Sequence, residues 1–287
     1  MTGADEPPAT VAAQLEDARR RFAEATIEEP RRTAESLLGF VIGCDRSHLF
    51  AHLERELSAQ EAERYRRLVE RRTTGEPTQY LLGVREFFGR DFEVSPAVLI
   101  PRPETELLVE AVLERAAENA RVLDVGTGSG CIAATLACER PSLGIFAVDI
   151  SSAALATAQR NALRHGANVC FMQGDVLQAT GDESFDVVVS NPPYVAQRDR
   201  PTLSRELRWE PELALFAGDD GLDIYRRLIP AAVRVLRPGG LLAVELGYDS
   251  LPGVLALLEE WDDVETQPDL AGITRIALAR RPRFAPR

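Results

Sequence analysis

From Arg121 onward, short apolar runs alternate with stretches that have the apolar spacing of a helix. The run Val122–Val125 leads through a glycine-rich segment into the helical stretch Cys131–Cys138, and Gly144–Ile150 leads into Ala153–Leu163. Continuous apolar runs of this length are typical of strands buried on both faces, and helical crossovers between them make the strands parallel. The pattern therefore predicts a doubly wound α/β domain, which sets limits on how the rest of the chain folds.

The remaining elements follow from the same patterns. Further strands are expected at Val169–Met172, Phe185–Ser190, Leu241–Leu246 and Thr274–Ala279, and helices at Leu222–Leu236 and Leu251–Leu258. Residues 10–74 have helical spacing, with a predicted capping box at Ser58 and Glu61, whereas residues 78–99 predict a hairpin or paired strands. We therefore expect a helical domain over residues 1–77, a β-hairpin linker over 78–100 and an α/β domain over 101–287, ending in a disordered basic tail at 280–287.

The charged residues exclude several kinds of chemistry. All 33 basic residues are arginine and none is lysine, which excludes a Schiff-base lysine and a Gly-Lys-Ser/Thr phosphate loop. Against 45 acidic residues the net charge is −12, which argues against non-specific binding to nucleic acid or to an anionic membrane. The acidic, proline-rich start resembles no signal peptide, so we expect a cytoplasmic protein. Four cysteines without Cys-x-x-Cys spacing and three scattered histidines predict no metal site.

The segment Gly126-Thr127-Gly128-Ser129-Gly130 follows a predicted strand and precedes a predicted helix. Glycines there permit a tight turn and let a ligand lie against bare backbone, while the helix N-terminus offers unsatisfied N–H groups. This pattern occurs in both dinucleotide and adenosyl-cofactor sites, so by itself it leaves the cofactor open.

Two acidic residues follow the next two strands. Asp149 ends the strand after the glycine-rich loop, where a carboxylate can accept hydrogen bonds from both hydroxyls of a ribose, although it can also cap the following helix. Asp175 follows the third strand and is predicted to accept from an adenine amino group while Val176 packs against the ring. An aspartate after a glycine is also common in turns.

The motif Asn191-Pro192-Pro193-Tyr194 separates the cofactor classes. The two prolines stiffen the backbone and remove two N–H donors, so we expect the carbonyls of Asn191 and Pro192 to face outward beside the asparagine side-chain oxygen. Two fixed acceptors of this kind can hold one NH₂ group, and Tyr194 supplies an aromatic face. Nothing in the motif serves hydride transfer.

A planar NH₂ group is a poor nucleophile because its lone pair is delocalised. When both hydrogens are held by fixed acceptors, the nitrogen can pyramidalise and direct its lone pair at an electrophile. The electrophile that suits an adenosyl site is the sulfonium methyl of S-adenosylmethionine. Catalysis is then mainly orientation, with the tyrosine ring stabilising the developing positive charge by about 1–2 kcal/mol.

With these motifs in place, the sequence resembles the HemK/PrmC family, the protein-glutamine methyltransferases that modify peptide chain release factors. The resemblance extends over nearly the whole chain. It includes Gly75-Glu76-Pro77, the run Leu99-Ile100-Pro101-Arg102-Pro103-Glu104-Thr105-Glu106, Glu210-Pro211, Asp220-Gly221-Leu222-Asp223 and Asp269-Leu270-Ala271-Gly272. The asparagine-proline-proline-aromatic motif is shared with other amino-group methyltransferases, whereas Pro101–Glu106 is much more particular to this family.

The resemblance implies a helical substrate-recognition domain, a hairpin linker and a seven-stranded, Rossmann-like methyltransferase domain. It implies Gly126–Gly130, Asp149 and Asn191 as S-adenosylmethionine contacts, with S-adenosylhomocysteine as the product. Asn191, Pro192, Pro193 and Tyr194 would hold the glutamine of the Gly-Gly-Gln loop of a class 1 release factor, and Asn191, Pro192 and Tyr194 would be catalytic. Many relatives have an aromatic residue where this chain has Val176. A monomer with no membrane or nucleic-acid partner is expected.

Four other functions stay open at this point. A ribosomal-protein glutamine methyltransferase is the nearest, although relatives of that kind have Pro-Arg-Ser-Pro in place of Pro101-Arg102-Pro103-Glu104. An amino-group methyltransferase acting on a flipped nucleic-acid base would use the same acceptor pair. A nicotinamide-binding oxidoreductase, or a cofactor-binding protein without catalysis, would use only the glycine-rich loop.

Overall fold

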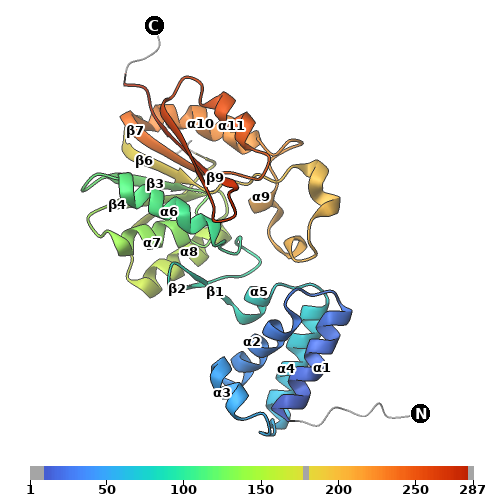
Figure 1. Cartoon of the computed structure of the whole chain (residues 1–287). Helices are drawn as coiled ribbons and strands as arrows, with labels where there is room; N and C mark the ends of the chain where they lie inside the picture. Colours follow the sequence, from blue (N-terminus) through green and yellow to red (C-terminus); the bar gives the residue numbers. More distant parts are fainter. Residues whose placement is uncertain (1–9, 177–180, 284–287) are drawn as a thin grey trace. The chain divides into compact units, whose positions relative to one another are not determined.

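The computed structural model describes residues 10–176 and 181–283 (Figure 1). The chain divides into two compact units, one with residues up to 83 together with 204–209 and the other with 84–203 and 210 onward. The first nine residues and positions 284–287 of the predicted tail lie outside the described residues. The prediction of a disordered tail is wrong for its start, because Arg280 ends a strand and the Arg281 N–H donates to the Gly240 carbonyl at 2.8 Å. Pairing with a neighbouring strand orders this polar segment.

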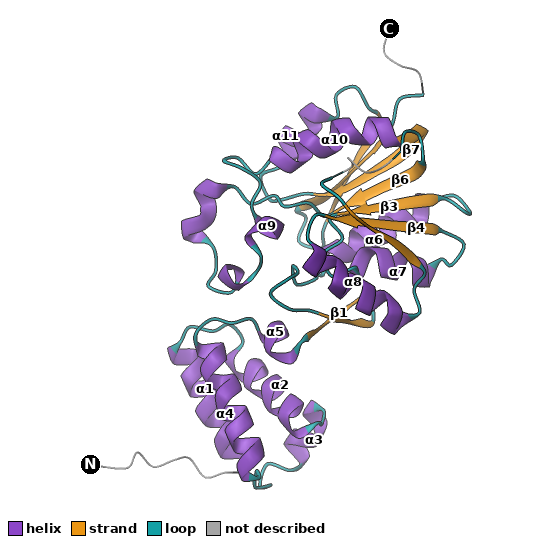
Figure 2. Ribbon diagram, turned by 180° about the vertical axis from the view of Figure 1, so that it is seen from behind, coloured by secondary structure: helices purple, strands orange, loops and turns teal. Residues whose placement is uncertain are grey.

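The N-terminal unit is a bundle of helices (Figure 2). The helices are α1 Val11–Glu24, α2 Pro30–Ile42, α3 Arg46–Ala51, α4 Ala59–Thr73 and α5 Thr78–Leu82. Phe22, Leu37 and Tyr65 are fully buried in its core, and the Tyr65 hydroxyl donates to the Ala34 carbonyl. The predicted capping box is confirmed, because Ser58 and Glu61 each accept a hydrogen bond from the other's backbone N–H.

The short segment 204–209 belongs to this helical unit although it comes from the second half of the chain. Arg205 donates to the Ala25 and Thr74 carbonyls, at 3.2 and 3.3 Å. Arg72 of α4 is 2% exposed and forms an ion pair with Glu206. Contacts of Arg205 in the segment and of Arg72 in the bundle therefore hold the segment on the bundle.

Residues 78–82 form helix α5, where the sequence predicted a strand. Tyr80 and Leu81 are both buried, and Leu81 belongs to the core of the helical unit. Packing against that core outweighs the strand preference of these residue types, which depends strongly on context. Gly83, at φ 73°, ends the helix, and the hairpin is confined to β1 Val84–Phe87 and β2 Arg90–Glu93.

The C-terminal unit contains a seven-stranded sheet with the order β5-β4-β3-β6-β7-β9-β8. Its strands are β3 Arg121–Val125, β4 Gly144–Asp149, β5 Val169–Gln173, β6 Phe185–Ser190, β7 Leu236–Glu245, β8 Asp262–Pro268 and β9 Thr274–Arg280. β3 to β7 pair with one another in parallel, and β9 is antiparallel to both β7 and β8. The predicted doubly wound domain is therefore confirmed.

Helices cover both faces of the sheet (Figures 1 and 2). The helices of this unit are α6 Glu104–Arg115, α7 Cys131–Glu139, α8 Ser152–His165, α9 Glu212–Leu215, α10 Asp223–Val235 and α11 Leu251–Leu257, and all but the short α9 lie on the sheet. Along β3, Val122 joins the core that includes residues of α6 and α7, whereas its neighbour Leu123 joins the core that includes residues of α10 and α11. This alternation is the period of a strand buried on both faces. Within the described ranges no helix is long and apolar enough to cross a membrane.

Strand β8 has no counterpart in the elements expected from the apolar pattern. Its residues Asp262–Glu265 are exposed, and the strand lies at the edge of the sheet with β9 as its partner. An edge strand with no buried face carries no apolar alternation, so only its hydrogen bonding to β9 reveals it.

Gly130 begins α7 at a point of very close packing. Its φ is 80°, and a Cβ there would lie 2.9 Å from the Cβ of Ala158 in α8. Gly166, which ends α8 at φ 65°, has no atom within 4 Å of the same position. Gly130 is therefore required both by its backbone conformation and by the approach of the two helices.

We expect Gly130→Ala to destabilise the protein more than Gly166→Ala. Both changes add the cost of a left-handed residue, about 1–2 kcal/mol, and only the first adds overpacking of about 1–3 kcal/mol. Urea unfolding of the two variants measures the difference. Equal losses would show that the helices separate freely at this point.

Candidate functional site

A cavity of about 220 Å³ lies where β3, β4, β5 and β6 end, and their loops line it. Other walls come from residues 97–99 before α6 and from Pro211, Leu213 and Ala214. The predicted site residues that line it are Gly126, Gly128, Asp149, Asp175, Val176, Asn191, Pro192 and Pro193. Thr127, Ser129, Gly130 and Tyr194 are not among the lining residues, so a cofactor contact by the first three stays a prediction.

The glycine-rich loop is pinned to the end of β4. The Gly126 and Thr127 N–H groups both donate to the Val148 carbonyl, at 2.8 and 3.1 Å. Gly126 and Gly128 have φ of 72° and 55°, and no protein atom comes closer than 4.0 Å to the Cβ position of either. The loop therefore presents bare backbone to the cavity, as a bound ligand requires.

Asp149 uses both carboxylate oxygens to fix the loops around it. Oδ2 accepts from the Gly128 N–H and Oδ1 from the Ser151 N–H, each at 2.9 Å. Ser151, not Asp149, caps helix α8 by accepting from the Ala154 N–H. Each carboxylate oxygen has a further lone pair, so this arrangement orients the carboxylate for a second set of donors in the cavity.

Asp175 forms an ion pair with Arg227 of α10, with 2.6 Å between Oδ2 and Nη2. The Arg227 side chain lines the same cavity and is about half exposed. The apolar pattern of α10 gave no sign that it brings a cation to this wall. A ligand atom that binds Asp175 would therefore contact a carboxylate that is already paired with the Arg227 guanidinium.

Asn191 lines the cavity and carries a buried acceptor. Its Nδ2 donates to the Thr105 hydroxyl at 3.1 Å, whereas its Oδ1 is buried with no hydrogen-bond partner among the described residues. The Thr105 hydroxyl in turn donates to Oε2 of Glu245 at 2.6 Å. An unpaired buried acceptor costs about 1–3 kcal/mol, which a donor from a bound molecule would recover.

Tyr194 lies against two glycines. A Cβ at Gly247 would fall 2.8 Å from the Tyr194 ring, and one at Gly221 would fall 2.4 Å from the Tyr194 carbonyl oxygen. Burial raises the pKa of the Tyr194 phenol above its usual value, and the nearby Glu245 carboxylate raises it further. The phenol therefore stays protonated and is not a base.

Two further side chains hold the walls of the cavity. The Glu210 carboxylate is almost fully buried and accepts from the Ile100 N–H at 3.0 Å and from Arg102 at 2.5 Å. Asn161, also buried, donates to the Ser129 and Glu93 carbonyls and accepts from the Glu93 N–H. These contacts tie the segment before α6 to Pro211, and the hairpin to the glycine-rich loop.

Sequence reasoning assigned no role to Thr105, Glu245, Asn161 or Arg227. One signal was available for Glu245, because it is a lone acid within the otherwise apolar run Leu241–Leu246, where an unpaired charge would be costly. Asn161 and Arg227 lie on helices whose spacing gives no hint of what they face.

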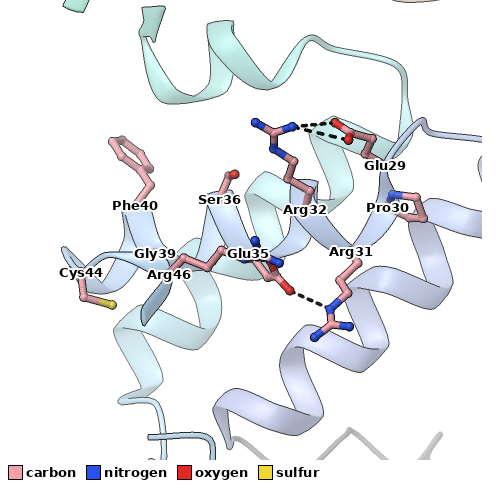
Figure 3. Close-up of a pocket in the computed structure, with 10 residues that line it drawn as sticks. All are labelled: Glu29, Pro30, Arg31, Arg32, Glu35, Ser36, Gly39, Phe40, Cys44 and Arg46. Carbon is pink, nitrogen blue, oxygen red and sulfur yellow. Dashed lines mark hydrogen bonds and ion pairs between the residues drawn. The ribbon is translucent and has the colours of Figure 1, made fainter. Parts of the chain in front are cut away.

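The helical unit has a separate, larger hollow of about 690 Å³ (Figure 3). Glu35 is 4% exposed and accepts from both Arg31 and Arg46, whose guanidinium groups also lie 5.3 and 5.5 Å from the centre of the Phe50 ring. Phe40 lies at one end of the hollow (Figure 3), and both phenylalanines are 39% exposed. Exposed aromatic and arginine side chains are enriched in protein interfaces.

Comparisons with known proteins agree with this architecture. A PrmC N-terminal domain model matches residues 13–83, and a methyltransferase small domain model matches residues 103–209. The T. thermophilus 16S rRNA N2 G1207 methyltransferase, solved with AdoMet and guanosine, has a TM-score of 0.53 at 21% identity, covering 69% of this chain and 49% of that one. The neighbour shows that the fold is shared, and the matched domain model is that of a methyltransferase.

Relatives that match nearly the whole chain identify its family. The release factor glutamine methyltransferase of Koribacter versatilis is 48% identical over 277 residues, which cover 95% of this chain and 99% of that protein. The one of Moorella thermoacetica is 46% identical over 279 residues, with the same two shares. The chain belongs to the release factor glutamine methyltransferase family, as the resemblance predicted.

The buried Asp124 in front of the glycine-rich loop gives a pH dependence of stability. Burial raises its pKa from 3.8 to about 7, although Oδ2 accepts from the Thr127 hydroxyl at 2.6 Å. Between these values the folded state holds a proton that the unfolded state has lost, so the free energy of unfolding falls as pH rises.

We expect Asp124→Asn to flatten this fall between about pH 4 and pH 7, because the variant has no proton to release at this position. Denaturant unfolding of both proteins at several pH values tests this. A variant whose stability runs parallel to that of the wild type would contradict it.

Proposed function

We propose that this enzyme transfers the methyl group of S-adenosylmethionine to the side-chain amide nitrogen of the glutamine in the Gly-Gly-Gln motif of class 1 release factors. The observation that carries the proposal is the Asn191 Oδ1 atom, a buried acceptor without a partner among the described residues, next to two prolines at the cavity wall. It suits one hydrogen of an amide NH₂. In this proposal the Pro192 carbonyl accepts the other hydrogen.

The protein residues act by orientation. With both amide hydrogens held, the nitrogen loses its conjugation and its lone pair points away from Asn191. The nitrogen gains the methyl group, becomes cationic and then releases a proton to water, so no lysine or histidine base is needed. The Tyr194 face stabilises the cation by about 1–2 kcal/mol in a desolvated site.

The residues around the cavity suit an adenosyl cofactor. In this proposal the bare backbone at Gly126 and Gly128 accommodates its methionine part, Asp149 accepts from the ribose, and Asp175 and Val176 meet the adenine. When bound, S-adenosylmethionine supplies an electrophilic methyl group and leaves as S-adenosylhomocysteine. Val176 gives less ring contact than an aromatic residue, so the Asp149 carboxylate carries more of the recognition.

Methyl transfer to a purified class 1 release factor, with mass-spectrometric mapping of the product, tests the function. We expect one methyl group on the glutamine of the Gly-Gly-Gln motif and none after that glutamine is changed. Transfer that survives the change would overturn the proposal. Activity on DNA or on a ribosomal protein would point to the rival substrates.

We expect Asn191→Ala to lower the rate of methyl transfer by about a hundredfold or more, because one of two orienting acceptors is lost. S-adenosylmethionine affinity, measured by calorimetry, should change much less. Asn168→Ala, at an exposed position, is the control and should keep full activity. An equal loss of cofactor affinity and rate would assign Asn191 to cofactor binding instead.

We infer that the helical unit recognises the release factor. The support is the hollow beside Phe40 and Phe50, where arginines lie over exposed aromatic rings in a chain of net charge −12. The enzyme is taken to act as a monomer in the cytoplasm, where release factors work.

We expect Phe40→Ala combined with Phe50→Ala to raise the KM for intact release factor about five- to thirtyfold, the effect of losing about 1–2 kcal/mol of contact. Transfer to a short Gly-Gly-Gln peptide should stay unchanged, since a peptide reaches only the catalytic unit. Leu163→Ala, at an 83% exposed position on α8, is the matched control. An unchanged KM would place recognition elsewhere.

A further inference from the structure

Three side chains from three elements form one line of hydrogen bonds. Asn191 follows β6, Thr105 is the second residue of α6, and Glu245 is the last residue of β7. The Asn191 Nδ2 donates to the Thr105 Oγ1 at 3.1 Å, and that hydroxyl donates to the Glu245 Oε2 at 2.6 Å. Thr105 and Glu245 are each 2% exposed, so water does not compete for these bonds.

Glu245 ends this line of hydrogen bonds, and its protonation state determines which way the Asn191 carboxamide points. An ionised Glu245 only accepts hydrogen bonds, so the Thr105 hydroxyl must give its single proton to it. The lone pairs of that hydroxyl are then left facing Asn191 and can pair only with its NH₂. The carboxamide oxygen must therefore point the other way, where it has no partner among the described residues.

A protonated Glu245 reverses this logic. It can donate to the Thr105 oxygen, which frees the threonine proton to bond the Asn191 oxygen after the carboxamide turns over. The NH₂ group would then take the place of the oxygen and meet the substrate NH₂, donor against donor. The two directions of the carboxamide thus correspond to a competent and an incompetent site.

The groups around Glu245 bring the pKa of its carboxyl group close to neutral pH. Burial raises the pKa of its carboxyl group from 4.5 to about 7, the Thr105 hydrogen bond opposes this, and the Glu104 carboxylate adds to it. Arg275 and Arg102 face the same group and favour its ionised form, while the phenols of Tyr194 and Tyr225 and the buried Cys131 thiol nearby stay neutral.

We propose that Thr105 and Glu245 are positioning residues that fix the direction of the Asn191 carboxamide, and that ionisation of Glu245 turns this acceptor toward the substrate amide. The inference rests on the proposed role of Asn191 in holding the glutamine. It assigns to Thr105, within the family-like run Pro101–Glu106, a function in the chemistry and not only in packing.

The test compares Thr105→Val, Thr105→Ser and Glu245→Gln in the full-length enzyme with release factor as substrate. Single-turnover methyl transfer is measured from pH 5.5 to pH 8.5, along with S-adenosylmethionine affinity and melting temperature. Thr135→Val is the matched control, since Thr135 is equally buried and its hydroxyl has no partner in the described part of the chain.

For the wild type we expect the rate to rise with pH through about 7 and then level off, as Glu245 ionises. Thr105→Val should lose about tenfold in rate with unchanged cofactor affinity, and Thr105→Ser should recover most of it because the hydroxyl returns. Glu245→Gln should be slower above pH 7 and should lack the rise. If Glu245 had only a structural role, replacing it would not remove the pH dependence of the rate.

The proposal is overturned if Thr135→Val loses as much rate as Thr105→Val, if serine fails to restore it, or if Glu245→Gln keeps the rise near pH 7. A second readout does not need activity. The ¹⁵N signal of the Asn191 side-chain amide should shift with pH through about 7 in the wild type and stay constant in Glu245→Gln. A wild type inactive on release factors would overturn the proposed function, whereas the amide titration separately decides the orientation of Asn191.

Discussion

The parallel pairing of β3 with β4 on one side and β6 on the other is the arrangement on which the site depends. Alternate residues of these strands enter the two cores, so a shift by one residue would exchange the faces and expose the apolar set. The strand order reverses direction at β3, and the loops after β3 and β6 therefore leave toward opposite faces of the sheet. A crevice opens between these loops, and the Gly126 loop and Asn191 line it. The local sequence of neither segment predicts that the two line the same crevice.

Buried polar side chains then fix the positions of the loops that line the crevice. Asp149 and Asn161 each satisfy two or more backbone groups and Glu210 satisfies one, so the loops that carry bare backbone are held by side chains instead of by regular secondary structure. Asn191 is different, because one end of its carboxamide is held by Thr105 and the other end has no partner among the described residues. A site that orients a neutral amide needs such a rigid, incompletely satisfied group, and the surrounding network provides the rigidity.

The arginines of this lysine-free chain have unequal importance. Several of those in the helical unit pair with glutamates three or four residues away on exposed helix faces, where ion pairs contribute little to stability. Arg102 with Glu210 and Arg72 with Glu206 are different, because one partner in each pair is almost fully buried. Removing the more exposed partner, Arg102 or Glu206, would leave a buried charge without its ion pair, which is a far larger cost.

The sequence by itself determined the class of fold, the family, and the motifs around Gly126, Asp149 and Asn191, because these depend on periodicity and on residues close together in the chain. It did not predict β8, whose exposed residues carry no alternation, or α5, where the helical core outweighs strand preference. Nor did it connect Thr105, Asn191 and Glu245, which are separated by 86 and 140 positions in the pairs that bond. Only the tertiary structure decided that connection, because the direction of a buried carboxamide depends on which donors and acceptors the packing of α6, β6 and β7 brings beside it.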